Sequence, residues 1–162
     1  MMKTNKKKIL GVMLASLISF GAATTAFAAV TADSAQEIAK KWIPAGAVHV
    51  LTEDDVTAYE VTFFDNAAKI KYEIEIDKLT EKVTEVKTKL TNSHGSNTIS
   101  LSRNDITEIT LKEFPDAIIR KLRLASDDGY QVYEVKFTTD TMRGELEINP
   151  ETGVILERKL KY

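Results

Sequence analysis

The side chains that could support catalysis or metal binding are few and scattered. The chain has no cysteine and only two histidines, His49 and His94. His49 lies in a β-prone stretch and His94 in a polar segment, and no His-x-x-His or His-Glu pairing accompanies either. The sequence also lacks a Gly-x-Ser-x-Gly elbow and a phosphate-binding loop. We therefore expect a structural role for His49, a solvated His94, and no catalytic, cofactor-binding or metal-binding residue.

Acidic pairs recur at matching places, Asp54-Asp55 and Asp127-Asp128. Clustered carboxylates can bind calcium, but no Asp-x-Asp-x-Asp loop is present. Aspartate is also common in tight turns, where its side chain bonds to the nearby backbone. Hairpin turns are therefore the favoured interpretation of both pairs.

The compact basic cluster Arg120, Lys121 and Arg123 is the candidate partner-binding site. Guanidinium and ammonium groups would suit a carboxylate of a partner protein or an anionic wall polymer. The alternative is an exposed strand face that carries charge only because it is solvated. The acidic total of the chain favours this second interpretation.

The elements that must position these residues occur in two copies. Residues 59–63 (Tyr-Glu-Val-Thr-Phe) return at 133–137 as Tyr-Glu-Val-Lys-Phe, and an amphipathic segment before each copy ends at Pro44 or Pro115. The offset between the copies changes only in predicted turns. Insertions are tolerated there, whereas a slip inside a strand would turn its core face outward. The pattern therefore predicts two homologous halves.

Each copy is expected to form one helix and then antiparallel strands. Ser34 with Glu37 matches a capping box for the first helix, and Ser102 or Asn104 is the expected cap of the second. Trp42 lies in helical register with apolar residues, which favours the core over an exposed anchor for a partner. The expected strands cover 47–51, 59–63, 70–76 and 83–89 in the first copy, and 118–124, 133–137, 142–148 and 154–161 in the second.

The chain begins with a pattern typical of a secretory signal peptide. Basic residues at positions 3–8 precede an apolar run and the sequence Ala26-Phe27-Ala28. Cleavage after Ala28 is the favoured interpretation over a retained single-pass anchor. Removing residues 1–28 takes away four lysines and no acid, so the formal charge moves from −2 to −6. This balance argues against a nucleic-acid partner and against an anionic membrane surface.

The predicted organisation is a signal peptide at 1–28, a first repeat at 30–90, a polar linker at 91–98 and a second repeat at 99–162. The expected class is α+β, with two tandem units that each pack one helix on a curled antiparallel sheet of three to four strands. Without cysteines, each short repeat must rely on packing alone, so the repeats either dock or are marginally stable.

These features resemble a PepSY domain, present twice. The resemblance rests on the capped helix that ends near a proline, the Tyr-x-Val-type strand, and the ending of residues 149–155, Asn-Pro-Glu-Thr-Gly-Val-Ile. Residues 77–83 are a weaker copy, because Glu81 stands at the turn glycine. If that position needs a positive φ, glutamate is unfavourable there, unless the first copy uses a different turn.

The resemblance implies an exported bacterial protein that binds another protein and is not an enzyme. PepSY domains occur in propeptides of secreted metallopeptidases and in stand-alone exported proteins, so the implied role is to inhibit or regulate an extracellular peptidase or envelope protein. A structural or sensory envelope protein that contacts wall polymer is the alternative. The expected location is extracellular or cell-wall associated, with no membrane span after cleavage; the oligomeric state is left open.

Overall fold

The computed structural model describes residues 30–162, so the expected signal peptide lies outside the described residues. The eight strands expected from the sequence are all present, with ends that differ by a few residues. The elements are α1 (Ala32–Ala39), the 3-10 helix η1 (Lys40–Trp42), β1 (Val48–Asp54), β2 (Ala58–Asp65), β3 (Ile70–Asp77), β4 (Val83–Leu90), α2 (Arg103–Glu113), β5 (Ile118–Asp127), β6 (Tyr130–Thr138), β7 (Arg143–Ile148) and β8 (Ile155–Lys161).

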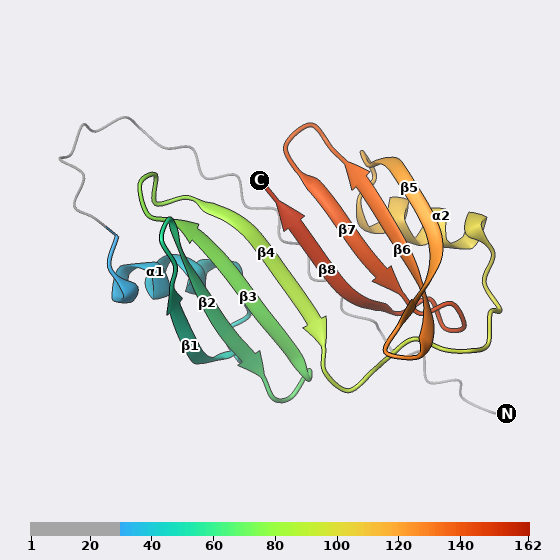
Figure 1. Cartoon of the computed structure of the whole chain (residues 1–162), viewed down its shortest axis with the longest axis horizontal. Helices are drawn as coiled ribbons and strands as arrows, with labels where there is room; N and C mark the ends of the chain where they lie inside the picture. The colour runs from blue at the N-terminus through green and yellow to red at the C-terminus, as the bar shows by residue number, and fades with distance from the viewer. Residues whose placement is uncertain (1–29) are drawn as a thin grey trace, which may run out of the picture.

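All eight strands belong to one antiparallel sheet, in the order β1-β2-β3-β4-β8-β7-β6-β5 (Figure 1). The α+β class predicted from the sequence is confirmed. The sheet is continuous, because the last strand of the N-terminal half, β4, pairs with the last strand of the C-terminal half, β8. The two edge strands are β1 and β5. Each is the first strand of its half, and their first residues, Val48 and Ile118, are 70 positions apart in the sequence.

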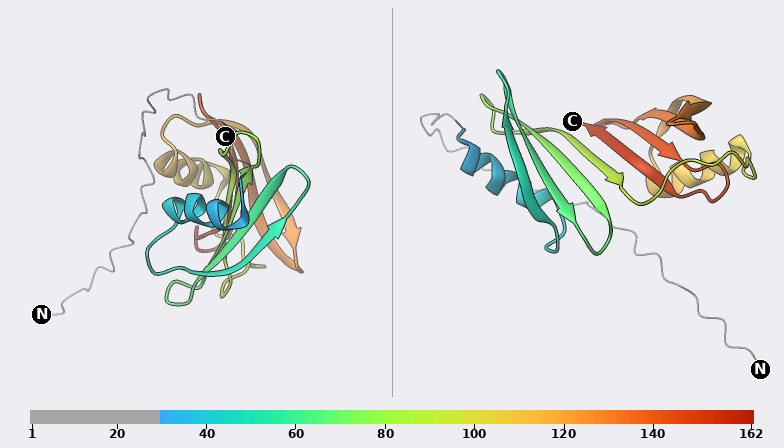
Figure 2. Two further views of the ribbon diagram at one scale, coloured as in Figure 1. Left: turned by 90° about the vertical axis from the view of Figure 1, so that its left-hand side faces the viewer. Right: turned by 60° about the horizontal axis from the view of Figure 1, so that its bottom comes forward.

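Helices α1 and α2 cover the same face of the sheet, and within residues 30–162 no helix lies on the other face, which we call the helix-free face (Figure 2). Helix α1 begins at Thr31, whose hydroxyl accepts from the Ser34 backbone N–H, while the Ser34 hydroxyl accepts from the Thr31 N–H. The predicted cap at Ser34 was therefore wrong by one turn, because Ser34 closes the box from its third position. Helix α2 begins at Ser102, one of the two caps expected, in a box with Asp105.

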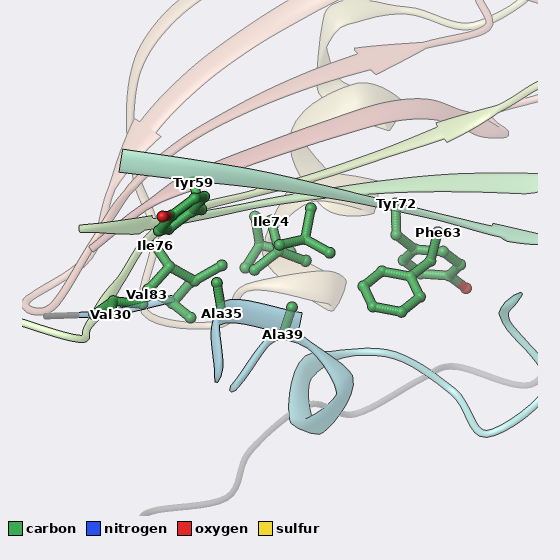
Figure 3. Close-up of a cluster of buried hydrophobic side chains, with 11 residues drawn as sticks. Val30, Ala35, Ala39, Tyr59, Phe63, Tyr72, Ile74, Ile76 and Val83 are labelled. Carbon is green, nitrogen blue, oxygen red and sulfur yellow. The ribbon is translucent and has the colours of Figure 1, made fainter. Parts of the chain in front are cut away.

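The helix-covered face holds the core, and α1 shows how it is built. Ala35 and Ala39 are fully buried, and their small side chains let the helix lie close against β2 and β3 (Figure 3). Trp42 is half-buried against the same cluster, as its helical register predicts. The buried side chains of this half are Val30, Ala35, Ala39, Tyr59, Val61, Phe63, Tyr72, Ile74, Ile76, Val83 and Val86. The second cluster is formed by Ile106, Tyr133, Val135, Phe137, Leu146 and Ile148.

The segment between the halves packs against β6. Ser96 bridges to Gln131, and the Asn149 side-chain amide donates to the His94 carbonyl at 2.9 Å. The His94 ring is exposed but stacks on Tyr130, with 4.1 Å between ring centroids. The expected solvated position of His94 is therefore only partly right, since this contact helps to hold the connection against the C-terminal half.

The turns that follow β3 and β7 have the same geometry in both halves. Glu81 has φ 58° and Gly153 has φ 73°. The Glu81 N–H donates to the Asp77 carbonyl at 3.0 Å, and the Gly153 N–H donates to the Asn149 carbonyl at 2.9 Å. The first copy thus uses the same turn, and glutamate occupies a left-handed position that suits glycine.

Replacing Glu81 with glycine is expected to raise the free energy of unfolding by about 0.5–1 kcal/mol, because the left-handed strain is removed and only part of the gain is lost to glycine's greater freedom when unfolded. Urea denaturation measures this. The matched change, Gly153→Ala, should destabilise, because a Cβ there would be strained and would lie 2.8 Å from Ile109 Cδ1. A Glu81→Gly variant no more stable than the wild type would contradict the strain argument.

Candidate functional site

The predicted partner-binding residues lie together on the edge strand β5. Arg120 is the extra residue of a β-bulge, and its Nε donates to Thr138 Oγ1 at 3.0 Å. Arg123 Nε donates to Glu134 Oε2 at 2.5 Å. Lys121 stands opposite Lys136 and is exposed. All three are on the surface, but both guanidinium groups are already engaged by β6.

The other edge strand, β1, has a β-bulge at the same position as β5 but carries different side chains. Its bulge falls at Val50, between the paired residues His49 and Leu51, just as Arg120 falls between Ile119 and Lys121. By strand register, the equivalents of the three basic residues of β5 are apolar or acidic in β1. They are Val50 for Arg120, Leu51 for Lys121, and Glu53 for Arg123.

The apolar residues of β1 are open to solvent. Val48 is 68% exposed, Val50 60% and Leu51 47%. Edge strands of natural sheets are usually protected from further pairing by charged side chains, above all lysine. Strand β5 has this protection, whereas β1 contains no lysine or arginine. Of the two edges, β1 is therefore the better suited to accept another strand.

The β1 edge is a candidate binding site that the sequence alone does not reveal, because it carries no cluster of basic residues. Short exposed apolar residues in a strand look like core residues until the sheet order is known. The equivalence of Val50 and Leu51 with Arg120 and Lys121 follows only from the pairing with β2 and β6. Aligning the sequences on Pro44 and Pro115 without a gap places Val50 and Leu51 on Lys121 and Leu122 instead, so the sequence alone does not mark this edge.

The helix-free face of the sheet is densely charged. Burial raises the pKa of Glu60, and the charges of Glu73 and Glu53 raise it further. Burial also raises the pKa of Glu147, to which the charge of Glu157 adds. In both cases burial is the larger cause, and the neighbouring glutamates add to it. Glutamates stand in equivalent rows on the two halves: Glu60, Glu75 and Glu85, and Glu134, Glu147 and Glu157.

At the centre of this face, ion pairs connect β4 with β8. Glu85 accepts from Lys159 at 2.9 Å and from Lys161 at 3.1 Å. Glu157 makes the equivalent pairs with Lys87 at 3.4 Å and Lys89 at 3.6 Å. We call these residues the junction ladder. Both glutamate side chains are only 16% exposed, so these pairs are less screened than ordinary surface pairs.

The pKa values within the junction ladder agree with strong pairing. Burial tends to raise the pKa of Glu85, but Lys159 and Lys161 outweigh this effect and lower it. Burial lowers the pKa of Lys87, but the charges of Glu157 and Glu73 outweigh this effect and raise it. Both groups are therefore held in their charged forms at neutral pH.

The remaining polar candidates have structural surroundings. His49 Nε2 lies 2.8 Å from Thr52 Oγ1, and its ring meets Phe63 edge-on. Asp55 Oδ1 accepts from the next backbone N–H, as aspartate does in turns, and Asp128 has φ 45° in the other hairpin. Across residues 30–162, no group of three or more histidine, aspartate or glutamate side chains is arranged to hold a metal ion.

Comparison with known families identifies the chain. The PepSY model, described as "Peptidase propeptide and YPEB domain", matches residues 29–87 and again residues 100–159. The chain belongs to the PepSY family. This confirms the resemblance seen in the sequence, including its occurrence in two tandem regions. No curated protein matches the chain.

Solved structures offer weaker similarities to this PepSY chain. A protein described as a lipoprotein from Clostridium difficile 630 is 22% identical, with 80% of this chain and 91% of that chain covered and a TM-score of 0.37. A DUF2874 family protein from Bacteroides uniformis is 15% identical, with coverage of 80% and 89% and a TM-score of 0.32.

Neither α1, η1 nor α2, the helices within residues 30–162, is long and apolar enough to cross a bilayer.

Proposed function

We propose that this PepSY protein is a non-catalytic binding module that accepts an extended segment of an exported protein along strand β1. The observation that carries the proposal is the chemistry of this edge, which exposes Val48, Val50 and Leu51 without a protecting cation. Main-chain hydrogen bonds would provide affinity, and the exposed side chains would provide selectivity. The family description, which includes peptidase propeptides, supports an exported peptidase as the partner.

The proposal includes the organisation expected from the sequence. Residues 30–90 and 99–162 are two PepSY repeats joined by 91–98, each with one helix on four strands, and residues 1–28 are a cleaved leader that directs the protein out of the cytoplasm. The family assignment supports the tandem repeats. The absence of cysteine is compatible with an exported protein, because continuity of the sheet replaces disulfides in holding the halves together.

The test exchanges the chemistry of the two edges. In a Val50→Arg/Leu51→Lys variant, β1 acquires the residues of β5, and we expect binding of the partner to weaken at least tenfold, about 1.4 kcal/mol. The partner is first co-purified from the secreted fraction and identified by mass spectrometry. Its affinity, and the inhibition of its activity if it is a peptidase, are then measured with purified proteins.

The matched control is Arg120→Val/Lys121→Leu, which gives β5 the residues of β1. Circular dichroism should show that both variants fold, since all four positions are exposed. Binding lost only with the β1 variant supports the proposal. Equal binding by the wild type and the β1 variant would exclude β1 as the docking edge.

A second candidate is contact between β5 and an anionic wall polymer, favoured by the gathering of Arg120, Lys121 and Arg123 on one edge. It ranks second because Arg120 and Arg123 already donate to Thr138 and Glu134. Sedimentation with purified cell wall, lost in the Arg120→Val/Lys121→Leu variant and at high salt, would favour it.

A further inference from the structure

The glutamate rows of the two halves match position by position except at their outer ends. In the C-terminal half, Glu134, Glu147 and Glu157 are followed outward by Arg123 on β5. In the N-terminal half, the equivalent glutamates on β2, β3 and β4 are followed outward by Glu53 on β1. One row therefore ends in a cation and the other in a fourth carboxylate.

The difference is visible in the ion pairs. Arg123 neutralises Glu134 at 2.5 Å. Within residues 30–162, no lysine or arginine lies within ion-pair distance of Glu53 or Glu60. Glutamates directly opposite each other on neighbouring strands repel, and Glu53 is directly opposite Glu60. The pKa of Glu60 is raised mainly by burial and further by the charges of Glu73 and Glu53, which Lys71 offsets only in part, in agreement with this repulsion.

A strand added beside β1 would lie about 4.8 Å away, which places its side chains opposite those of β1. On the helix-free face these side chains would meet Val48, Leu51 and then Glu53, because the partners of these residues on β2, Phe64, Thr62 and Glu60, face that side. An incoming cation opposite Glu53 would neutralise the outer end of the N-terminal glutamate row, as Arg123 neutralises Glu134 in the C-terminal half. An incoming carboxylate would extend the repulsion to a fifth strand.

We infer that β1 selects an extended segment that carries lysine or arginine opposite Glu53 and apolar residues opposite Val48 and Leu51. This selectivity rests on the proposed strand addition and names the chemistry of its ligand. The sheet edge supplies the binding site, since its outer backbone groups have no strand partner within residues 30–162. Charge complementarity then sets the register of the segment and discriminates among candidate partners.

The test uses two synthetic peptides of equal length with alternating valine and threonine, identical except for lysine or glutamate at one central position. Each is titrated into ¹⁵N-labelled protein, and shifts of the β1 and β5 amide signals are followed by NMR. We expect the lysine peptide to shift β1 and to bind at least tenfold more tightly than the glutamate peptide. A Glu53→Arg variant, which copies Arg123, should lose this preference.

The control is Lys121→Glu, which changes the charge by two units in the opposite direction on the opposite edge and should leave the preference intact. Binding of both peptides to β1 with equal affinity would overturn the charge selectivity while leaving strand addition in place. If neither peptide reaches β1, the selectivity is overturned, and strand addition is then judged separately by the edge-exchange variants and the co-purified partner. A preference that persists in Glu53→Arg would also overturn the inference.

Discussion

Replacing Gly144 with alanine should cost about 2–3 kcal/mol of unfolding free energy, which is large for the addition of one methyl group. A Cβ at this position would lie closer than 3.0 Å to three ring atoms of Phe137. Phe137 is fully buried and packs against Phe114 with 4.6 Å between ring centroids, so its ring has little room to move. Urea or thermal denaturation followed by circular dichroism measures the loss.

The equivalent position in the N-terminal half shows why glycine is needed. Tyr72 stands there, opposite Phe63, and both rings fit because they lie beside each other (Figure 3). In the C-terminal half, the ring of Phe137 lies directly over Gly144 instead. A Phe137→Leu/Gly144→Ala double variant should therefore lose less stability than the sum of the two single variants. A Gly144→Ala protein within about 0.5 kcal/mol of the wild type would contradict the overpacking argument.

Reversing both glutamates of the junction ladder, Glu85→Lys with Glu157→Lys, should uncouple the two halves. Each new lysine would stand among two others at a site where the glutamate was only 16% exposed, so we expect a loss of about 3–4 kcal/mol of docking free energy. Because the two buried clusters lie in separate halves, each half should retain its own core. Scanning calorimetry should then show two unfolding transitions in place of one.

Two variants control this experiment. Glu85→Lys with Lys159→Glu and Lys161→Glu restores opposite charges across the junction and should recover most of the coupling. Glu145→Lys makes the same change on the same face at a pair with Lys136 whose side chains are 51% and 44% exposed, and should cost less than about 1 kcal/mol. A single transition at the wild-type temperature in the double reversal would show that the ladder does not hold the halves together.

The strands were predictable because each pairs locally and alternates between two chemically distinct faces. Tyr59, Val61 and Phe63 face the core while Glu60 faces the helix-free side, and this period of two leaves little freedom in register. The helix start was less predictable. Thr31 and Ser34 are both good caps, and the choice depends on which one lies in extended backbone, which the sequence does not specify locally.

The continuous sheet was not predicted, since a free strand edge does not indicate its partner. The information was nevertheless in the sequence, where residues 85–89 and 157–161 both read Glu-x-Lys-x-Lys. Two such strands are complementary when antiparallel, because each glutamate meets the far lysine of the other strand. The two candidate binding edges also differ in how far the sequence reveals them. The basic residues of β5 are visible as a cluster, whereas the β1 edge is meaningful only once the sheet order is known.

The symmetry of the junction ladder has a consequence for how the protein behaves on dilution. Lys87 pairs with Lys159, its counterpart in the duplication, so the contact is of the kind made by two identical subunits across a two-fold axis. Separate subunits joined in this way would dissociate in dilute solution. Here a short connection holds the strands at an effective concentration in the millimolar range. The sheet therefore persists at any protein concentration, and both of its outer edges are always presented together.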